Sequence, residues 1–218
     1  MRIRVEDPSI DWLSLEPQSD RKDVVITEGG TPRTVGTTSE EITLVEVEGV
    51  PALRRTQAME SEVLGDRETA TVVFRDGFLP FSHLDVTDEY TLSVAYRGTR
   101  VAGRKELANG ETIFMRADLA IPVFDAHSVE VVLRVLPLVD GYIAEVPVFH
   151  AGRGREMVVV AQVFGRETLL RSGESVDAWK VKTDWNGVTQ YYWIGVETRA
   201  LLLQSSELSD GIRLEFVT

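Results

Sequence analysis

The sequence predicts a mainly β protein in which an antiparallel sheet carries one helix on one of its faces. Short β-prone runs separated by turn residues recur along most of the chain, which is typical of antiparallel sheets. Residues 175–204 show the pattern of an aromatic hairpin, and residues 126–136 alone have the spacing of an amphipathic helix. Because the segments around it are β-prone, the helix must bury its apolar stripe against the sheet.

The N-terminal part differs from the rest in composition. Residues 1–23 are predicted as a polar N-terminal segment with Pro8 and Pro17, and with a single helical turn around Ile10 to Leu15. Residues 24–218 contain no evident linker, fixed-period repeat or low-complexity stretch. The chain length of 218 residues suits one larger all-β domain, so we predict that residues 24–218 form a single unit.

Short strands and turns fill the first half of that unit. Turn-forming dipeptides that end in glycine recur there, namely Gly29-Gly30, Asp76-Gly77 and Asn109-Gly110. The last of these predicts a hairpin. The alternation in ITLVEVEG is imperfect, so its buried face is left open. The predicted strands lie in the runs VVIT, ITLVEVEG, VPALRRTQAM, ETATVVFR, FLPF, YTLSVAYRG, TRVAGRKEL and TIFMRADL.

The predicted helix begins after Asp125, a favourable N-cap residue, and ends at Pro137. Glu130 and Arg134 stand four residues apart and are predicted to form an i, i+4 pair. Four valines in this stretch argue for a strand instead, because β-branched residues lower helix propensity. The apolar stripe at helical spacing consists of Val129, Val132, Leu133 and Leu136.

Two further strands are predicted after the helix. EMVVVAQVFG is apolar at nearly every position, which predicts a strand covered on both faces. Pro147 lies inside the run IAEVPVF and marks an edge or a bulge. The chain closes with TRALLLQ and, after Asp210-Gly211, with IRLEFV.

The aromatic hairpin can be paired residue by residue, because Asn186-Gly187 suits a two-residue type I′ turn. Side chains alternate between the faces of a strand, so the turn fixes which residues share a face. One face is mostly apolar, and its predicted pairs are Trp185 with Val188, Thr183 with Gln190, Val181 with Tyr192 and Trp179 with Ile194. The other face, predicted to be the solvent side, places Lys180, Lys182 and Asp184 opposite Trp193, Tyr191 and Thr189, so that lysine stems lie along aromatic rings.

Composition narrows the classes of function. With 35 acidic and 23 basic residues the net charge is -12, which disfavours binding to nucleic acid. No run approaches the roughly 20 apolar residues of a membrane-spanning helix. The chain has no cysteine, which excludes disulfides and thiol chemistry. The first residues lack the apolar segment of a secretion signal, so we expect either a cytosolic protein or an exported one whose leader was removed.

A search for catalytic or metal-binding motifs gives no signature. His83, His127 and His150 show no metal-ligand spacing, and His127 is expected to be a surface residue of the first helical turn. We therefore predict no catalytic residue, no metal and no cofactor. The densest basic run, Arg97, Arg100, Arg104 and Lys105, is interpreted as a solvated strand face, with docking of an acidic partner as the alternative.

The last ninety or so residues resemble an uncharacterised bacterial domain family. Four elements carry the resemblance. They are an aspartate-led helix at residues 125–134, a Gly-Arg-Glu step at residues 165–167, a glycine followed by Ala-Trp-Lys-Val at residues 173–181, and a Tyr-Trp strand followed by Thr-Arg and leucines at residues 192–203. Such families are similar to periplasmic lipoprotein carriers of the LolA/LolB type. The resemblance implies a strongly curved antiparallel sheet, a lipocalin-like half-barrel, whose concave face is covered by helix around an apolar cavity. It also implies export to the cell envelope.

These observations lead to two hypotheses of function. The first is a non-enzymatic binding protein that holds a lipid or other apolar molecule between the concave face and the helix. Its expected contact residues are Trp179, Val181, Tyr192 and Ile194 from the hairpin and Val129, Leu133 and Leu136 from the helix. The alternative is a protein-interaction or envelope-assembly module with a fully packed core, which meets its partner through Lys180, Lys182, Tyr191 and Trp193.

Overall fold

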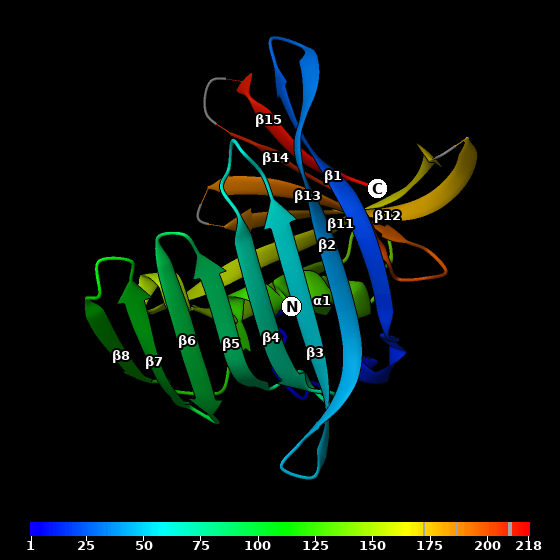
Figure 1. Cartoon of the computed structure of the whole chain (residues 1–218). Helices are drawn as coiled ribbons and strands as arrows, with labels where there is room; N and C mark the ends of the chain where they lie inside the picture. Colours follow the sequence, from blue (N-terminus) through cyan, green and yellow to red (C-terminus); the bar gives the residue numbers. More distant parts are fainter. Residues whose placement is uncertain (172, 186, 209–210) are drawn as a thin grey trace.

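A single fifteen-stranded sheet forms the protein (Figure 1). The structure is a computed structural model and describes residues 1–171, 173–185, 187–208 and 211–218. Asn186 and Asp210, each the first residue of a turn predicted from the sequence, lie outside these residues. The strand order is β8-β7-β6-β5-β4-β3-β2-β1-β15-β14-β13-β12-β11-β10-β9.

Within the described residues, the chain contains fifteen strands, three short 3₁₀ turns and one short α-helix. The strands are β1 (Gln18–Glu28), β2 (Thr31–Val47), β3 (Val50–Glu60), β4 (Arg67–Phe74), β5 (Pro80–Thr87), β6 (Tyr90–Arg97), β7 (Arg100–Leu107), β8 (Thr112–Asp118), β9 (Phe124–Asp125), β10 (Ile143–His150), β11 (Arg155–Arg171), β12 (Glu174–Trp185), β13 (Val188–Gly195), β14 (Leu201–Glu207) and β15 (Arg213–Val217). The helical elements are η1 (Trp12–Ser14), η2 (Ala126–Ser128), α1 (Val129–Val135) and η3 (Ala151–Arg153).

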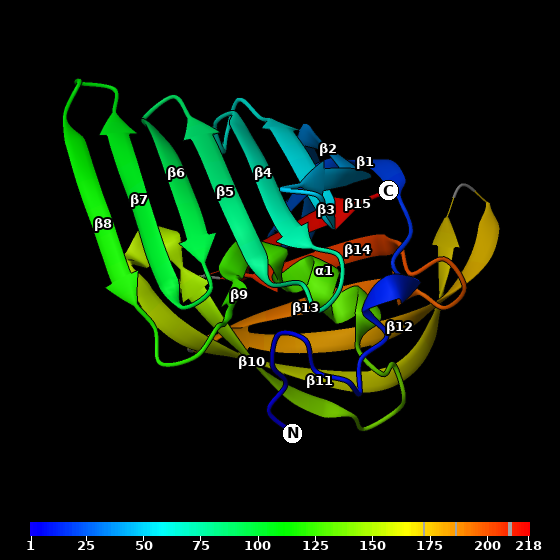
Figure 2. The same ribbon diagram turned by 90° about the horizontal axis from the view of Figure 1, so that it is seen from below.

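The sheet is a meander in which the first and last strands of the chain lie side by side in the middle. Consecutive strands are neighbours throughout each half, and the first strand, β1, pairs with the last, β15. The two edge strands, β8 and β9, are consecutive in the chain, and β9 pairs with β10 in parallel. The sheet is strongly curved, and α1 lies between its two halves, with β3 to β5 on one side and β11 to β13 on the other (Figure 2). The predicted mainly β fold, with a curved antiparallel sheet and one helix on its concave face, is confirmed.

The helix forms where the sequence predicted it, in two parts. The carboxylate of Asp125 accepts a hydrogen bond from the backbone N–H of His127 at 2.8 Å, so this residue caps the entry as expected. Three 3₁₀ residues then lead into α1, and Leu136 leaves the helical conformation before Pro137. The strand alternative for this stretch is therefore wrong. The apolar stripe, Val129, Val132, Leu133 and Leu136, is almost completely buried.

The expected ion pair within the helix is replaced by pairs to the sheet. Glu130 binds Arg55 on β3, and Arg134 binds Glu40 on β2. Arg134 is fully buried rather than solvated. The pairs to the sheet were not predicted, because spacing along a helix does not show which polar residues face another element.

The N-terminal segment is part of the core, which differs from the prediction for residues 1–23. The first strand begins within that segment, at Gln18, and crosses the predicted boundary. The indole of Trp12 packs against Phe78 and Phe124, with ring centroids 5.1 Å and 5.8 Å away. Isolated apolar residues in a polar sequence give no periodic signal, so their burial was not predicted. The residues that join the core are Ile3, Ile10, Trp12 and Leu15.

Strand β11 is covered on one face only, so the prediction of burial on both faces is wrong. Met157, Val159, Ala161 and Val163 are buried, whereas Val158, Val160 and Phe164 are 37%, 40% and 51% exposed. β-branched residues also suit an exposed strand face, because they fit the extended backbone without being buried. An apolar run therefore did not require two covered faces.

The register of the aromatic hairpin is confirmed. Strands β12 and β13 pair Trp185 with Val188, Thr183 with Gln190, Val181 with Tyr192 and Trp179 with Ile194.

Among the described residues, none of the helices combines the length and the apolarity needed to cross a membrane.

The packing of the helix predicts a large effect of truncating Leu133, which is fully buried in the main core. We expect Leu133→Ala to lower the free energy of unfolding by about 2–5 kcal/mol, because it leaves a cavity between helix and sheet. Leu170→Ala is the matched control: Leu170 is 79% exposed on β11, and the change should stay within about 0.5 kcal/mol. Urea denaturation measures both. Equal effects of the two changes would contradict the packing described.

Candidate functional site

Polar residues, with one methionine among them, form three rows across the concave face of β1 to β5, where the resemblance had implied an apolar cavity. The rows follow from strand register, because residues paired across neighbouring strands point to the same face. One row consists of Arg55, Thr71 and His83; the next of Asp20, Glu40, Gln57, Thr69 and Asp85; and the third of Lys22, Thr38, Met59 and Arg67. Most of these side chains are buried or half-buried beneath the helix.

A buried ionic network joins the first two rows to the helix. Arg55 donates from Nε to Oε2 of Glu40 at 2.6 Å and from Nη1 to the carbonyl of His127 at 2.9 Å, and it also binds the Glu130 carboxylate. Glu40 binds Arg134 through its other oxygen. These contacts fix the first and last turns of the short helix against β2 and β3.

In this network, each buried charge is stabilised by an opposite charge beside it. Burial alone would raise the pKa of Glu40, but the charges of Arg55 and Arg134 outweigh it and lower the pKa to about 2. Burial likewise opposes the charge of Arg55, yet the carboxylates of Glu130 and Glu40 raise its pKa above the ordinary value. Glu40 and Arg55 are therefore both charged at neutral pH.

The three histidines converge beside this network, although their spacing in sequence gave no such indication. The rings of His83 and His127 are stacked, with centroids 4.1 Å apart and planes 12° from parallel. The ring of His150 meets His127 edge-on at 6.2 Å. Burial, and then the neighbouring His83, lower the pKa of His127 to about 3. His127 is thus a neutral, inward-facing residue rather than the surface residue that we expected.

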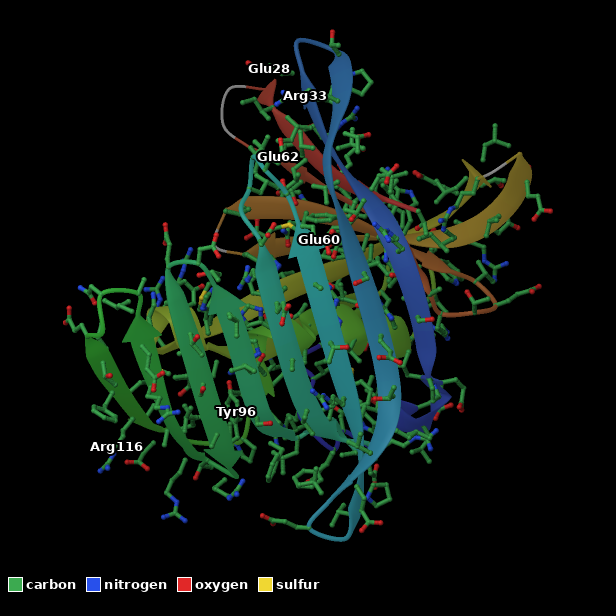
Figure 3. All side chains as sticks on the ribbon, viewed as in Figure 1. Glu28, Arg33, Glu60, Glu62, Tyr96 and Arg116 are labelled. Atoms are coloured by element: carbon green, nitrogen blue, oxygen red, sulfur yellow. The ribbon has the colours of Figure 1, made fainter. Side chains whose placement is uncertain are left out.

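Two aspartates flank the histidine pair. Asp85 accepts hydrogen bonds from Nε and Nη2 of Arg67 at 2.8 Å and 2.9 Å, and from the Tyr90 hydroxyl at 2.9 Å. Asp125, fully buried, accepts a hydrogen bond from the hydroxyl of Tyr96, which is labelled on β6 in Figure 3. Burial and the charge of Asp125 raise the pKa of Tyr96, so its hydroxyl keeps its proton.

Two adjoining cavities open on the concave face near the start of the helix. The first has a volume of about 330 Å³ and lies between β1–β4, β14–β15 and the helix. The second has a volume of about 290 Å³ and extends toward Trp185 and Tyr192 of the hairpin. Gln57, His127, Glu130 and Gln204 line both. The apolar part of the first cavity is formed by Met59, Leu64, Leu201, Leu214 and Phe216.

The residues predicted to contact a ligand lie together, but mainly in packed core. Val129 and Tyr192 line the second cavity. Trp179, half-buried, packs against the edge of the core. The other four, Val181, Ile194, Leu133 and Leu136, are buried in the main cluster and do not line either of the two cavities.

The opposite face of the hairpin is less exposed than expected. Trp193 is buried there and donates from Nε1 to Glu167 at 2.7 Å. Lys180 binds the same carboxylate, and its Nζ lies 5.0 Å from the centroid of the Trp193 ring and 5.4 Å from that of Tyr191. The predicted lysine–aromatic stacking is confirmed for Lys180, but a small outer cluster with Ala178 and Leu202 removes Trp193 from solvent.

The basic run divides between the two faces of the sheet. Arg97, Arg100 and Arg104 are exposed on the outer face, where Arg97 pairs with Glu48 at 3.5 Å and Arg104 with Glu106 at 3.2 Å. Lys105 points inward, and its Nζ lies 3.8 Å from the centroid of the Tyr90 ring. Arg116 adds a further positive charge at the open edge, on β8 (Figure 3).

Comparison with known proteins places this architecture among families without an established function. The family model DUF3108, described as a protein of unknown function, matches residues 25–217. No curated protein matches the chain. A crystal structure from Brucella abortus, described as a beta-barrel-like protein of the domain of unknown function DUF1849, covers 94% of this chain and 97% of its own, with a TM-score of 0.59 and 12% identity. A likeness at that identity shows the fold alone. Neither match names a lipoprotein carrier, so that resemblance stays an expectation.

The ionic network predicts that Glu40→Gln is strongly destabilising. The change removes the one carboxylate that both Arg55 and Arg134 bind, and leaves two buried guanidinium groups undercompensated. We expect the free energy of unfolding to fall by about 3–5 kcal/mol. Glu41→Gln, at the exposed neighbouring position on the opposite face of β2, should change it by less than about 0.5 kcal/mol. Similar effects of the two changes in urea denaturation would contradict the network.

The same pair of proteins tests the pH dependence. The pKa of Glu40 falls from 4.5 to about 2 on folding, so the ionised form stabilises the folded state. The contribution is fully present above about pH 4.5 and is lost as the pH falls toward about 2. The stability difference between the natural protein and Glu40→Gln should therefore shrink across this window. A difference that stays constant there would show that Glu40 is not the titrating group.

Proposed function

This chain belongs to the DUF3108 family, whose function is unknown, and we propose that it is a non-enzymatic binding protein for a small lipid-like molecule. The ligand occupies the two adjoining cavities on the concave face. The first cavity, of about 330 Å³, falls within the range of small-molecule sites, and the second, of about 290 Å³, lies just below it. Together they offer room for a ligand larger than either cavity alone could hold.

The observation that carries this proposal is the partly exposed apolar wall of the first cavity. Met59, Leu214 and Phe216 are half-buried, and Leu64 is 39% exposed. An apolar chain placed against them gains roughly 25 cal/mol for each Å² of apolar surface removed from water. By contrast, the tightly packed side chains around Leu133 leave no corresponding surface to cover.

The polar lining makes an amphiphile a better fit than a pure hydrocarbon. Gln57 and Gln204 border both cavities, and their carboxamides both donate and accept hydrogen bonds. A ligand therefore places its apolar part toward the apolar wall of the first cavity, and a polar group toward the two glutamines and His127. This refines the expectation of an apolar site.

Binding is favoured over catalysis because the charged groups that line the first cavity already form ion pairs with protein groups. Lys22 binds Asp20, Arg67 binds Asp85 and Glu130 binds Arg55. His127 is held neutral, and its backbone carbonyl accepts from Arg55. The alternative of a protein-interaction module has weaker support, because Trp193, one of its four expected contact residues, is buried in the outer cluster.

A cavity-filling substitution tests the proposal. We expect Gln57→Trp to reduce the uptake of a fluorescent fatty-acid probe at least tenfold, because the new ring occupies the space shared by both cavities. Thr56→Trp is the matched control, since Thr56 is the next residue of β3 and points to the outer face. Its probe uptake should equal that of the natural protein. Probe titration measures both, and thermal melting verifies that both variants fold.

Native mass spectrometry of gently purified protein provides a test that needs no substitution. A bound species that an apolar solvent extracts is the expected result. A natural protein that is always empty and takes up no fatty-acid probe would contradict the proposal, as would equal uptake by the Gln57 and Thr56 variants.

A further inference from the structure

His83, Asp85 and His127 form a compact cluster whose potential ligand atoms lie within 4.8 Å of one another. His83 and Asp85 are two residues apart on β5, so both side chains point to the concave face. His127 approaches from η2 at the entry to the helix. Imidazole nitrogen and carboxylate oxygen are common ligands of zinc and related transition metals.

The strongest indication is a nitrogen of His83 that has no partner. The residue is 2% exposed, and its Nε2 is buried without a hydrogen bond within the described residues. A buried polar atom without a hydrogen-bond partner is unfavourable, so the binding of an occupant to this nitrogen is favoured. The atom belongs to the same cluster that offers the two other ligand groups.

The surroundings of His83 prepare Nε2 to bind a cation. Its Nδ1 lies 3.0 Å from the Thr71 hydroxyl and 3.9 Å from a carboxylate oxygen of the fully buried Asp125. The Thr71 hydroxyl can donate to or accept from this nitrogen, whereas the Asp125 carboxylate only accepts; the carboxylate therefore favours the tautomer with the proton on Nδ1, which leaves the lone pair on Nε2. In a metal-bound histidine, the ring nitrogen that does not bind the metal usually forms a hydrogen bond, often to a carboxylate.

The other two residues also have lone pairs available. The neutral imidazole of His127 carries a lone pair on one ring nitrogen. Oδ1 of Asp85 accepts one hydrogen bond, from Nε of Arg67, which leaves a lone pair on that oxygen. His127 lines both cavities, so an ion can reach the cluster from solvent.

The stacked rings must separate before both can bind one ion. A metal lies near the plane of each ligating imidazole, and two nearly parallel planes about 4 Å apart do not share such a position. His83 is locked by Thr71, whereas His127 borders open cavity space into which its ring can turn. We propose that His83 Nε2, Asp85 and a reoriented His127 form a site for a zinc-class divalent metal, with a remaining position open to the cavity.

The experiment uses the untagged full chain, stripped of metal with a chelator and titrated with Zn²⁺ by calorimetry. We expect one saturable site, and at least a tenfold loss of affinity in His83→Gln and in Asp85→Asn. His150→Gln is the matched control, because that ring lies near His127 but outside the cluster, and its affinity should be unchanged. Mg²⁺ should not compete, since it prefers oxygen ligands.

A measurement on the natural chain guards against variants that fail to fold. The chain has three histidines, so long-range ¹H–¹⁵N spectra distinguish all of their ring nitrogens. On addition of Zn²⁺, we expect a large coordination shift at Nε2 of His83 and at one nitrogen of His127, with His150 little changed. The absence of saturable zinc binding, zinc binding that leaves His83 Nε2 unshifted, or an equal loss of affinity in His150→Gln would overturn the proposal.

Discussion

Glu40 holds two guanidinium groups together in the interior, and the position of the helix depends on this contact. Arg55 belongs to the sheet and Arg134 to the helix, so the carboxylate between them joins two elements that are far apart in sequence. Removing charged groups from water is unfavourable by several kcal/mol each, and only close pairing compensates for it. The network therefore favours the placement of the helix in which Glu130 meets Arg55 and Arg134 meets Glu40.

This placement divides the interior into an apolar and a polar part. Leu133 and Leu136 face the packed side, toward the hairpin strands, while Glu130 and His127 face the charged rows of β1 to β5. The cavities lie at the boundary between the two parts, where neither close apolar packing nor ion pairing fills the space. Their mixed lining is thus a consequence of how the helix is held.

Local sequence patterns predicted the elements and much of their pairing. The Asn-Gly turn and the alternation beyond it were enough to pair Val181 with Tyr192, and Asp125 with Pro137 bounded the helix. In each case the signal and the structure it specifies lie within a few residues. The meander extends this success, because most strands pair with their neighbour in sequence.

The candidate site could not be predicted in the same way, because it is assembled by long-range pairing. Polar residues such as Glu40 and His83 follow the alternation of a solvated strand, and only the closure of β1 on β15 and the curvature of the sheet turn that face inward. His127 meets His83 because the two-residue strand β9, just before the helix, contacts β5 across the concave face. A polar strand face in a curved meander is therefore as good a candidate for a site as an apolar one, and strand order, rather than spacing along the chain, decides between them.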